Sequence, residues 1–209
     1  MTKDDSNTRG QAFALEGIAA ALVVILAVTF ALSATAITPL TASTSNQQIE
    51  EQNRLVATDI LNTAEQERAI TQLALNHDGE AFVGLDDGDE GYSGPPINED
   101  GDLTELGELL EETLDDELIA FNMYIQYQTE DGTESIKVVD QGVATDHSAT
   151  AKQTLVLHED MELPDSHPSE TLGDLDECDP QFYAPNVDCF EDDSPVYNIV
   201  TIELEVWKL

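Results

Sequence analysis

The side chains best suited to chemistry are two cysteines, four histidines and 44 carboxylates. The histidines are isolated from one another along the chain, at His77, His147, His158 and His167. The sequence contains no nucleophile elbow of the G-x-S-x-G type, no H-E-x-x-H pair and no phosphate-binding glycine loop. With so many acids, paired carboxylates arise by chance and do not indicate a glycosidase. We therefore expect no enzyme activity and no catalytic residues.

The two cysteines, Cys178 and Cys189, are separated by ten intervening residues. Outside the cell such a pair most simply forms a disulfide that closes a loop, worth about 2 to 3 kcal/mol in the chain-entropy model. The alternative is a metal site with His158 and His167, but no CxxC or HxxxH spacing supports zinc. The acidic clusters between His77 and Asp102 do not fit the order of a calcium-binding EF-hand. We expect a disulfide, no metal and no cofactor.

The charge of the chain is extreme, with 44 acidic residues against 7 basic ones and a formal net charge of -37. The basic residues are scattered singly, so no patch can neutralise a run of phosphates, and nucleic acid is excluded as a partner. The acids are spread over nearly the whole chain outside one apolar run. Such a distribution is typical of proteins in very concentrated salt, where the Debye length falls to roughly 3 Å at 1 M. We expect a halophilic protein.

One segment near the start is long and apolar enough to cross a membrane. From Gly17 to Ile37 there is no charged residue, and at about 1.5 Å per residue this run reaches about 32 Å, close to the hydrocarbon thickness of a bilayer. Lys3 and Arg9 precede it, which places the N-terminus in the cytoplasm and the remainder outside by the positive-inside rule. We expect a leader at residues 1–10 and a single transmembrane helix at residues 11–40.

This apolar segment has three interpretations. It resembles a secretory signal peptide, because Ala34-Thr35-Ala36 is an A-x-A cleavage site after an apolar stretch. It also fits a plain uncleaved anchor. The third interpretation rests on Glu16, an acid at the head of the run that the first two interpretations do not require. A carboxylate in the membrane costs roughly 2.5 to 3.5 kcal/mol at the centre and less near the interface. Glu16 is therefore either paired with another subunit, or hydrated in the headgroup zone and stabilised by the helix dipole.

The stretch from Arg9 to Gly17 resembles the class III leader of archaeal type IV prepilins, with a basic residue and a glycine before the cut and a glutamate entering a long helix. The resemblance implies that a prepilin peptidase cleaves between Gly10 and Gln11 on the cytoplasmic side. It also implies that Glu16 pairs with the new amino terminus of a neighbouring subunit. Cleavage after Gly10 makes Glu16 the sixth mature residue, whereas the family's usual position is the fifth, which cleavage after Gln11 would restore.

A closer resemblance extends over residues 10–17 and 38–45, which are similar to a haloarchaeal family of pilin-like membrane proteins. It implies a single-pass protein of the cell membrane with an extracellular head, present in a surface filament or accessory to one. The implied partners are the prepilin peptidase, other pilin-like subunits and the membrane. The rival interpretation, from another class, is a membrane-anchored extracytoplasmic binding module that does not polymerise.

Beyond the apolar run, residues 41–77 predict an amphipathic stalk helix. Pro39 is expected to kink or stop the membrane helix, and one of Ser43, Thr44 or Ser45 to cap the next one. Apolar residues keep helical spacing on one face of this segment, at Ile49, Val56, Ile60, Ala64, Ile70, Leu73 and Ala74. The pattern is typical of the second half of a pilin spine, and a juxtamembrane coiled coil would look similar.

The remaining chain predicts an acidic loop at residues 78–102 and an α+β head at residues 103–209. Asp102 and Glu105 form a capping-box pattern before a leucine-rich helix that ends near Ile119. Alternating residues then predict a hairpin around a type I′ turn at Asp131-Gly132. Two further strands are expected, over residues 154–158 and 197–208. We therefore expect a long N-terminal helix, half membrane and half amphipathic, and a head with one helix packed on a small antiparallel sheet.

Overall fold

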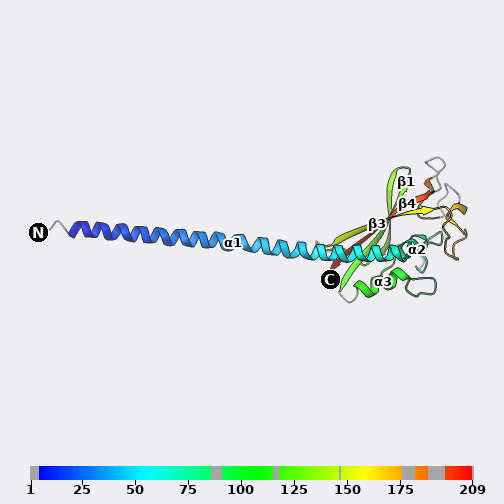
Figure 1. The fold of residues 1–209 in the computed structure, drawn as a ribbon, viewed down its shortest axis with the longest axis horizontal. Helices are drawn as coiled ribbons and strands as arrows, with labels where there is room; N and C mark the ends of the chain where they lie inside the picture. The colour runs from blue at the N-terminus through cyan, green and yellow to red at the C-terminus, as the bar shows by residue number, and fades with distance from the viewer. Residues whose placement is uncertain are drawn as a thin grey trace. The chain divides into compact units, whose positions relative to one another are not determined.

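The fold is that of a computed structural model, which describes residues 5–85, 91–114, 118–145, 147–175, 182–187 and 196–208. The chain forms two compact units, Met1–Gln48 and Ile49–Leu209. Cys178 and Cys189 lie outside the described residues, so their disulfide stays a prediction. The observed architecture is α+β, with an apolar N-terminal helix and a head made of helices and one antiparallel sheet (Figure 1).

The first helix, α1 (Asp5–Gln66), includes both the apolar run and most of the predicted stalk. A stop at Pro39 and a new helix start near Ser43 are wrong, because both residues lie inside α1, whereas the alternative of a kink at Pro39 stays a prediction. A proline removes one backbone hydrogen bond and disturbs the preceding turn. That local loss does not end the helix here, where the residues on either side continue the helical conformation.

The stalk ends in a break that the sequence pattern does not reveal. After α1 ends, Arg68 takes a left-handed backbone conformation with φ of 63°, and α2 (Ala69–Leu75) follows. The amphipathic pattern is confirmed on both sides of this break. The buried face comprises Ala57, Ile60, Leu61, Ala64, Ala69, Ile70, Leu73 and Ala74. The acids Glu51, Asp59 and Glu65 are exposed on the other side.

The leucine-rich helix of the head, α3 (Glu105–Leu114), is confirmed, but its cap differs from the expected one. The hydroxyl of Thr104, and not the side chain of Asp102, accepts a hydrogen bond from the backbone N–H of Gly107 at 3.1 Å. Thr104 satisfies one of the free N–H groups of the first turn in the way an N-cap residue does. The helix also ends earlier than expected, since Leu118 lies outside it and is 66% exposed at φ of 54°.

The sheet has four antiparallel strands in the order β2-β1-β4-β3. Their bounds are β1 (Ile119–Thr129), β2 (Gly132–Asp140), β3 (Ala149–His158) and β4 (Val196–Lys208). A short 3-10 helix, η2 (Leu172–Asp174), lies between β3 and β4. The hairpin is confirmed, but the type I′ turn is wrong. Thr129 pairs with Gly132, so the central turn residues are 130 and 131, and neither has the positive φ that type I′ requires.

One face of the sheet and the helices of the head bury a common core. Met123 and Ile125 from β1 lie opposite Leu204 and Ile202 from β4, and all four are fully buried. These side chains share one cluster with the buried residues of α1, α2 and α3. Burying one such side chain stabilises the fold by about 1.5 to 3 kcal/mol. Leu61 of α1 is 1% exposed in this core, so the C-terminal part of α1 is an integral element of the head.

The connection from β2 to β3 lies against the opposite face of the sheet, a feature that the sequence does not predict. The amide of Asn122 in β1 donates to the carbonyl of Gly142 at 2.9 Å, and the hydroxyl of Ser148 donates to Glu205 in β4 at 2.9 Å. Trp207 is only 3% exposed and does not belong to the main core cluster. The sheet is therefore buried on both faces at this end.

Gly107→Ala tests the packing of α3. A Cβ at this position would lie 2.4 Å from the carbonyl oxygen of Pro96, a backbone atom that cannot rotate away. Alanine normally favours a helix over glycine by about 1 kcal/mol, so destabilisation here would identify the contact as the cause. We expect a loss of about 1 to 3 kcal/mol in the free energy of unfolding, measured by denaturant titration of the full chain. Gly94→Ala is the control, because its Cβ meets no atom within 4 Å.

Candidate functional site

The candidate site is the apolar part of α1, Phe13–Leu32, which is 20 residues long. At about 1.5 Å per residue it reaches about 30 Å, the thickness of a bilayer's hydrocarbon core. Within the described residues it is the one helix long and apolar enough to cross a membrane, and it lies near the N-terminus as a signal sequence also would. The observation agrees with the expectation of a single membrane-anchoring segment.

This segment is apolar on every side. Its large side chains are exposed around the helix, from 52% at Val28 to 78% at Phe30. A helix that packs along a soluble core shows one apolar stripe and one polar face, whereas a helix that is apolar all round needs lipid or other helices around it. Phe13–Leu32 is therefore suited to a surrounding of lipid or of other helices.

The polar groups of the segment differ in how they are satisfied. The hydroxyl of Thr29 donates to the carbonyl oxygen of Ile25 at 2.8 Å, which hides its polarity inside the helix. Glu16 has no such partner: among the described residues it makes no hydrogen bond and no ion pair. It lies one turn from the start of the segment, where a carboxylate is less costly than at mid-membrane.

The residue after Glu16 is a glycine with free space around it. A Cβ at Gly17 would meet no atom within 4 Å, and Ala19 and Ala20 follow on the next turn. Small residues let a second helix approach closely, which is how helices associate in lipid. Gly10 and Gln11, the residues at the expected cleavage site, lie within α1 ahead of Glu16. The three residues therefore lie near one end of the same helix.

The head contains a cluster of aromatic rings around His77 that the sequence does not predict. The His77 ring packs edge-on against Phe82, Phe182 and Tyr183, with centroids 5.5 to 5.6 Å apart. Its Nδ1 accepts a hydrogen bond from the backbone N–H of Gly79 at 3.1 Å. Burial lowers the pKa of His77 to about 4, because it disfavours the charged form of the ring. His77 is a neutral packing residue near pH 7 and is not suited to act as a base.

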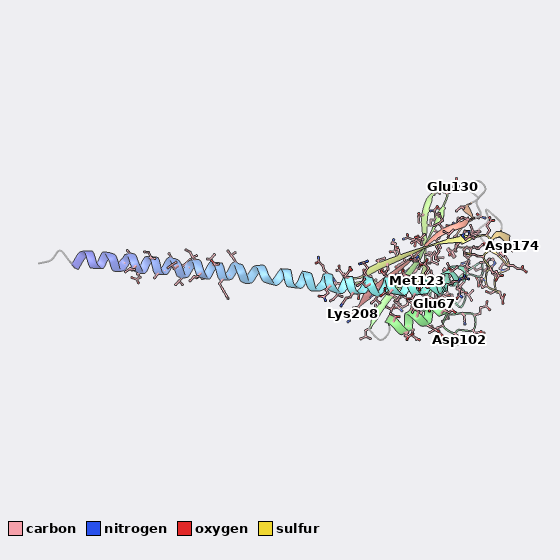
Figure 2. All side chains as sticks on the ribbon, in the orientation of Figure 1. Glu67, Asp102, Met123, Glu130, Asp174 and Lys208 are labelled. Atoms are coloured by element: carbon pink, nitrogen blue, oxygen red, sulfur yellow. The ribbon has the colours of Figure 1, made fainter. Side chains whose placement is uncertain are left out.

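A cleft of about 410 Å³ opens beside this cluster. It is lined by side chains of mixed character, including His77, Glu80, Phe82, Leu85, Ile136 and Lys137. A volume of this size suits a small ligand. Within the described residues no group of three or more His, Cys, Asp or Glu side chains is arranged to hold a metal ion. Figure 2 draws the described side chains of the head as sticks on the ribbon.

The comparisons with known proteins address the chain as a whole. Residues 9–206 match a family of unknown function, DUF7288. The chain belongs to this family. The match begins at Arg9 and extends into β4, so DUF7288 covers the apolar segment, the stalk and the head together. No curated protein and no solved structure matches the chain.

The buried histidine gives the head a defined response to acid. The pKa of His77 is about 4 in the folded chain and near 6.5 when unfolded, so between these values the unfolded state binds a proton that the folded state does not. Stability due to His77 is complete above pH 6.5 and is lost as the pH falls toward 4, by about 3 kcal/mol. His77→Asn removes this titration and keeps an acceptor for Gly79.

The measurement is denaturant unfolding of the full chain at several pH values between 7 and 4. We expect the stability of His77→Asn to fall less steeply with acid than that of the wild type. His158→Asn is the control, because His158 is exposed on β3. Parallel pH profiles for all three proteins would contradict the assignment.

Proposed function

We propose that this protein is a pilin-like, membrane-anchored structural subunit, either forming an archaeal surface filament or accessory to one. The observation that carries the proposal is the helix Phe13–Leu32, which is apolar on every side and begins near Glu16, an acid with no partner among the described residues. The resemblance of residues 9–17 to a class III prepilin leader supports the same conclusion. On this proposal the helix spans the membrane once, with its start in the cytoplasm and the head outside.

Assembly would follow from the chemistry of this one segment. Cleavage after Gly10 or after Gln11 by a prepilin peptidase frees a new amino terminus a few residues before Glu16. In lipid, helices gain little from hydrophobicity and associate through close packing and polar contacts. Pairing of Glu16 with a neighbouring subunit would fix the axial register between them, while the apolar side chains fill the bundle. The acidic head would face a solvent of high salt, in which its net repulsion is screened.

A second candidate function is a membrane-anchored binding module that does not polymerise. The cleft of about 410 Å³ beside His77 is the observation that favours it. In this case the stalk is a spacer and the head a receptor. The apolar segment would then remain in lipid as a single helix, and Glu16 would lie in the headgroup zone.

The mass of the N-terminus distinguishes these functions, measured on protein from the native membrane and from the medium. A terminus at Gln11 or Ala12 is expected, because it marks prepilin processing. An intact Met1 or Thr2 would favour the anchored binding module. A terminus at Ile37 would remove the membrane helix and contradict both functions.

Glu16→Ala tests the register role directly. We expect the variant to insert into the membrane normally and to be lost from filaments, because the acid is needed only between subunits. The measurement compares the subunit in the membrane fraction with that in filaments sheared from cells. Glu65→Ala, which removes an exposed acid of α1, is the matched control. Normal filaments from Glu16→Ala would contradict the register role.

A further inference from the structure

We propose that a cleft at one end of the head binds the apolar helix of a second copy of this chain, with Lys208 pairing with that copy's Glu16. This inference rests on the proposed function, since it concerns how one subunit holds another. It differs from pairing with the new amino terminus, because it assigns a side chain of the head as the partner of the acid.

The cleft has a volume of about 380 Å³ and lies where α1, the start of β1 and the end of β4 meet. Its lining includes Ile49, Asn53, Leu55, Val56, Ile119 and Lys208. Most of these side chains are apolar, yet Leu55 is 50% exposed, while α1 buries its neighbouring apolar positions at Ala57 and Ile60. An apolar surface left open beside a well-packed core suits an apolar partner.

The polar side chains of the cleft are the amides of Gln52 and Asn53, which can donate and accept hydrogen bonds, and the ammonium group of Lys208, which only donates. Lys208 is exposed and, among the described residues, makes no ion pair. Asn53 is 5% exposed, and its Nδ2 has no hydrogen-bond partner among the described residues. The cleft has apolar walls and a cation, Lys208, that is unpaired among the described residues. It therefore suits a ligand that is apolar and carries one acid.

The chain contains a segment of that description, Phe13–Leu32 with Glu16. Its apolar side chains are uncovered on all sides, and Glu16 is unpaired among the described residues. In a protein of net charge -37 exposed acids are common, but an acid at the head of an apolar helix is not. Charge and polarity thus match the helix of one copy to the cleft of another.

The scarcity of cations strengthens the assignment. Arg54 pairs with Glu51 at 2.6 Å, Lys137 with Asp140 at 2.6 Å, and Lys152 with Glu203 at 2.8 Å. After the expected cleavage, which removes Lys3 and Arg9, only Arg68 and Lys208 remain without an acidic partner among the described residues. Arg68 lies at the junction of α1 and α2 and does not line the cleft. Of these two cations, Lys208 is the one that lies on an apolar surface.

The pairing would form only during assembly. In the membrane, the proposed topology keeps Glu16 at the cytoplasmic side and every head outside. When subunits are extracted into a filament and displaced along its axis, the helix of one copy reaches the head of another. The acid is then buried against an apolar cleft and neutralised by Lys208, where the pair is screened less by salt than an exposed pair is.

Charge reversal tests the pair. Glu16→Lys and Lys208→Glu, made singly, are each expected to lower the amount of subunit in sheared filaments by about tenfold or more, since each places like charges in contact. The double variant is expected to recover filaments because it restores the pair in reverse. Arg68→Glu is the matched control, with the same change of charge at the other unpaired cation, and is expected to assemble normally.

A zero-length carbodiimide cross-link gives an independent measurement on native filaments. We expect a linked peptide pair joining Glu16 to Lys208, and mixed isotope labels in it will show that the two residues come from different copies. Normal filaments from Lys208→Glu, no recovery in the double variant, or Glu16 linked only to the new amino terminus would each overturn the inference. Each of those results can be obtained while the wild type still forms filaments, and then only the pairing is overturned. If the wild type forms no filaments, the proposed function is overturned and this pairing with it.

Discussion

The burial of one face of α1 against the sheet is the contact on which the head depends. Ala57, Ile60, Leu61 and Ala64 pack into the same cluster as the central strands β1 and β4. The first part of the same helix, Phe13–Leu32, has no such partner and is apolar all round. The two parts of α1 are therefore suited to different surroundings. The side chains of the first part are apolar all round, whereas those of the second part are apolar on one side only.

The secondary structure of the head was predictable because its patterns are local. Alternation in β1 and β4 and the leucine spacing of α3 identify these elements directly. Other features depend on contacts between distant residues. Whether Thr104 or Asp102 caps α3, and whether Leu118 continues it, is decided by how the chain meets Pro96 and β1. The continuation through Pro39 likewise depends on residues on both sides of the proline.

The candidate site was only partly predictable, for a related reason. Glu16 is conspicuous in the sequence because an acid within an apolar run is costly, so polarity alone identifies it. Lys208 is not conspicuous, since a lysine at the end of a strand is ordinary. Its position on an apolar cleft emerges only when Ile49 and Val56 of α1 lie beside Ile119 of β1. A partner from another chain leaves no pattern of spacing in the sequence at all.

The charge of the protein limits how its copies can associate. At roughly 1 M salt the Debye length is about 3 Å, so repulsion between acidic heads is largely removed while contacts at shorter range persist. Under such conditions exposed ion pairs such as Arg54–Glu51 contribute little to stability or recognition. If copies associate as we propose, specific contact between them would come from apolar surface and from charges shielded by it. Phe13–Leu32 provides the apolar surface, and Glu16 the charge, on one helix of every copy.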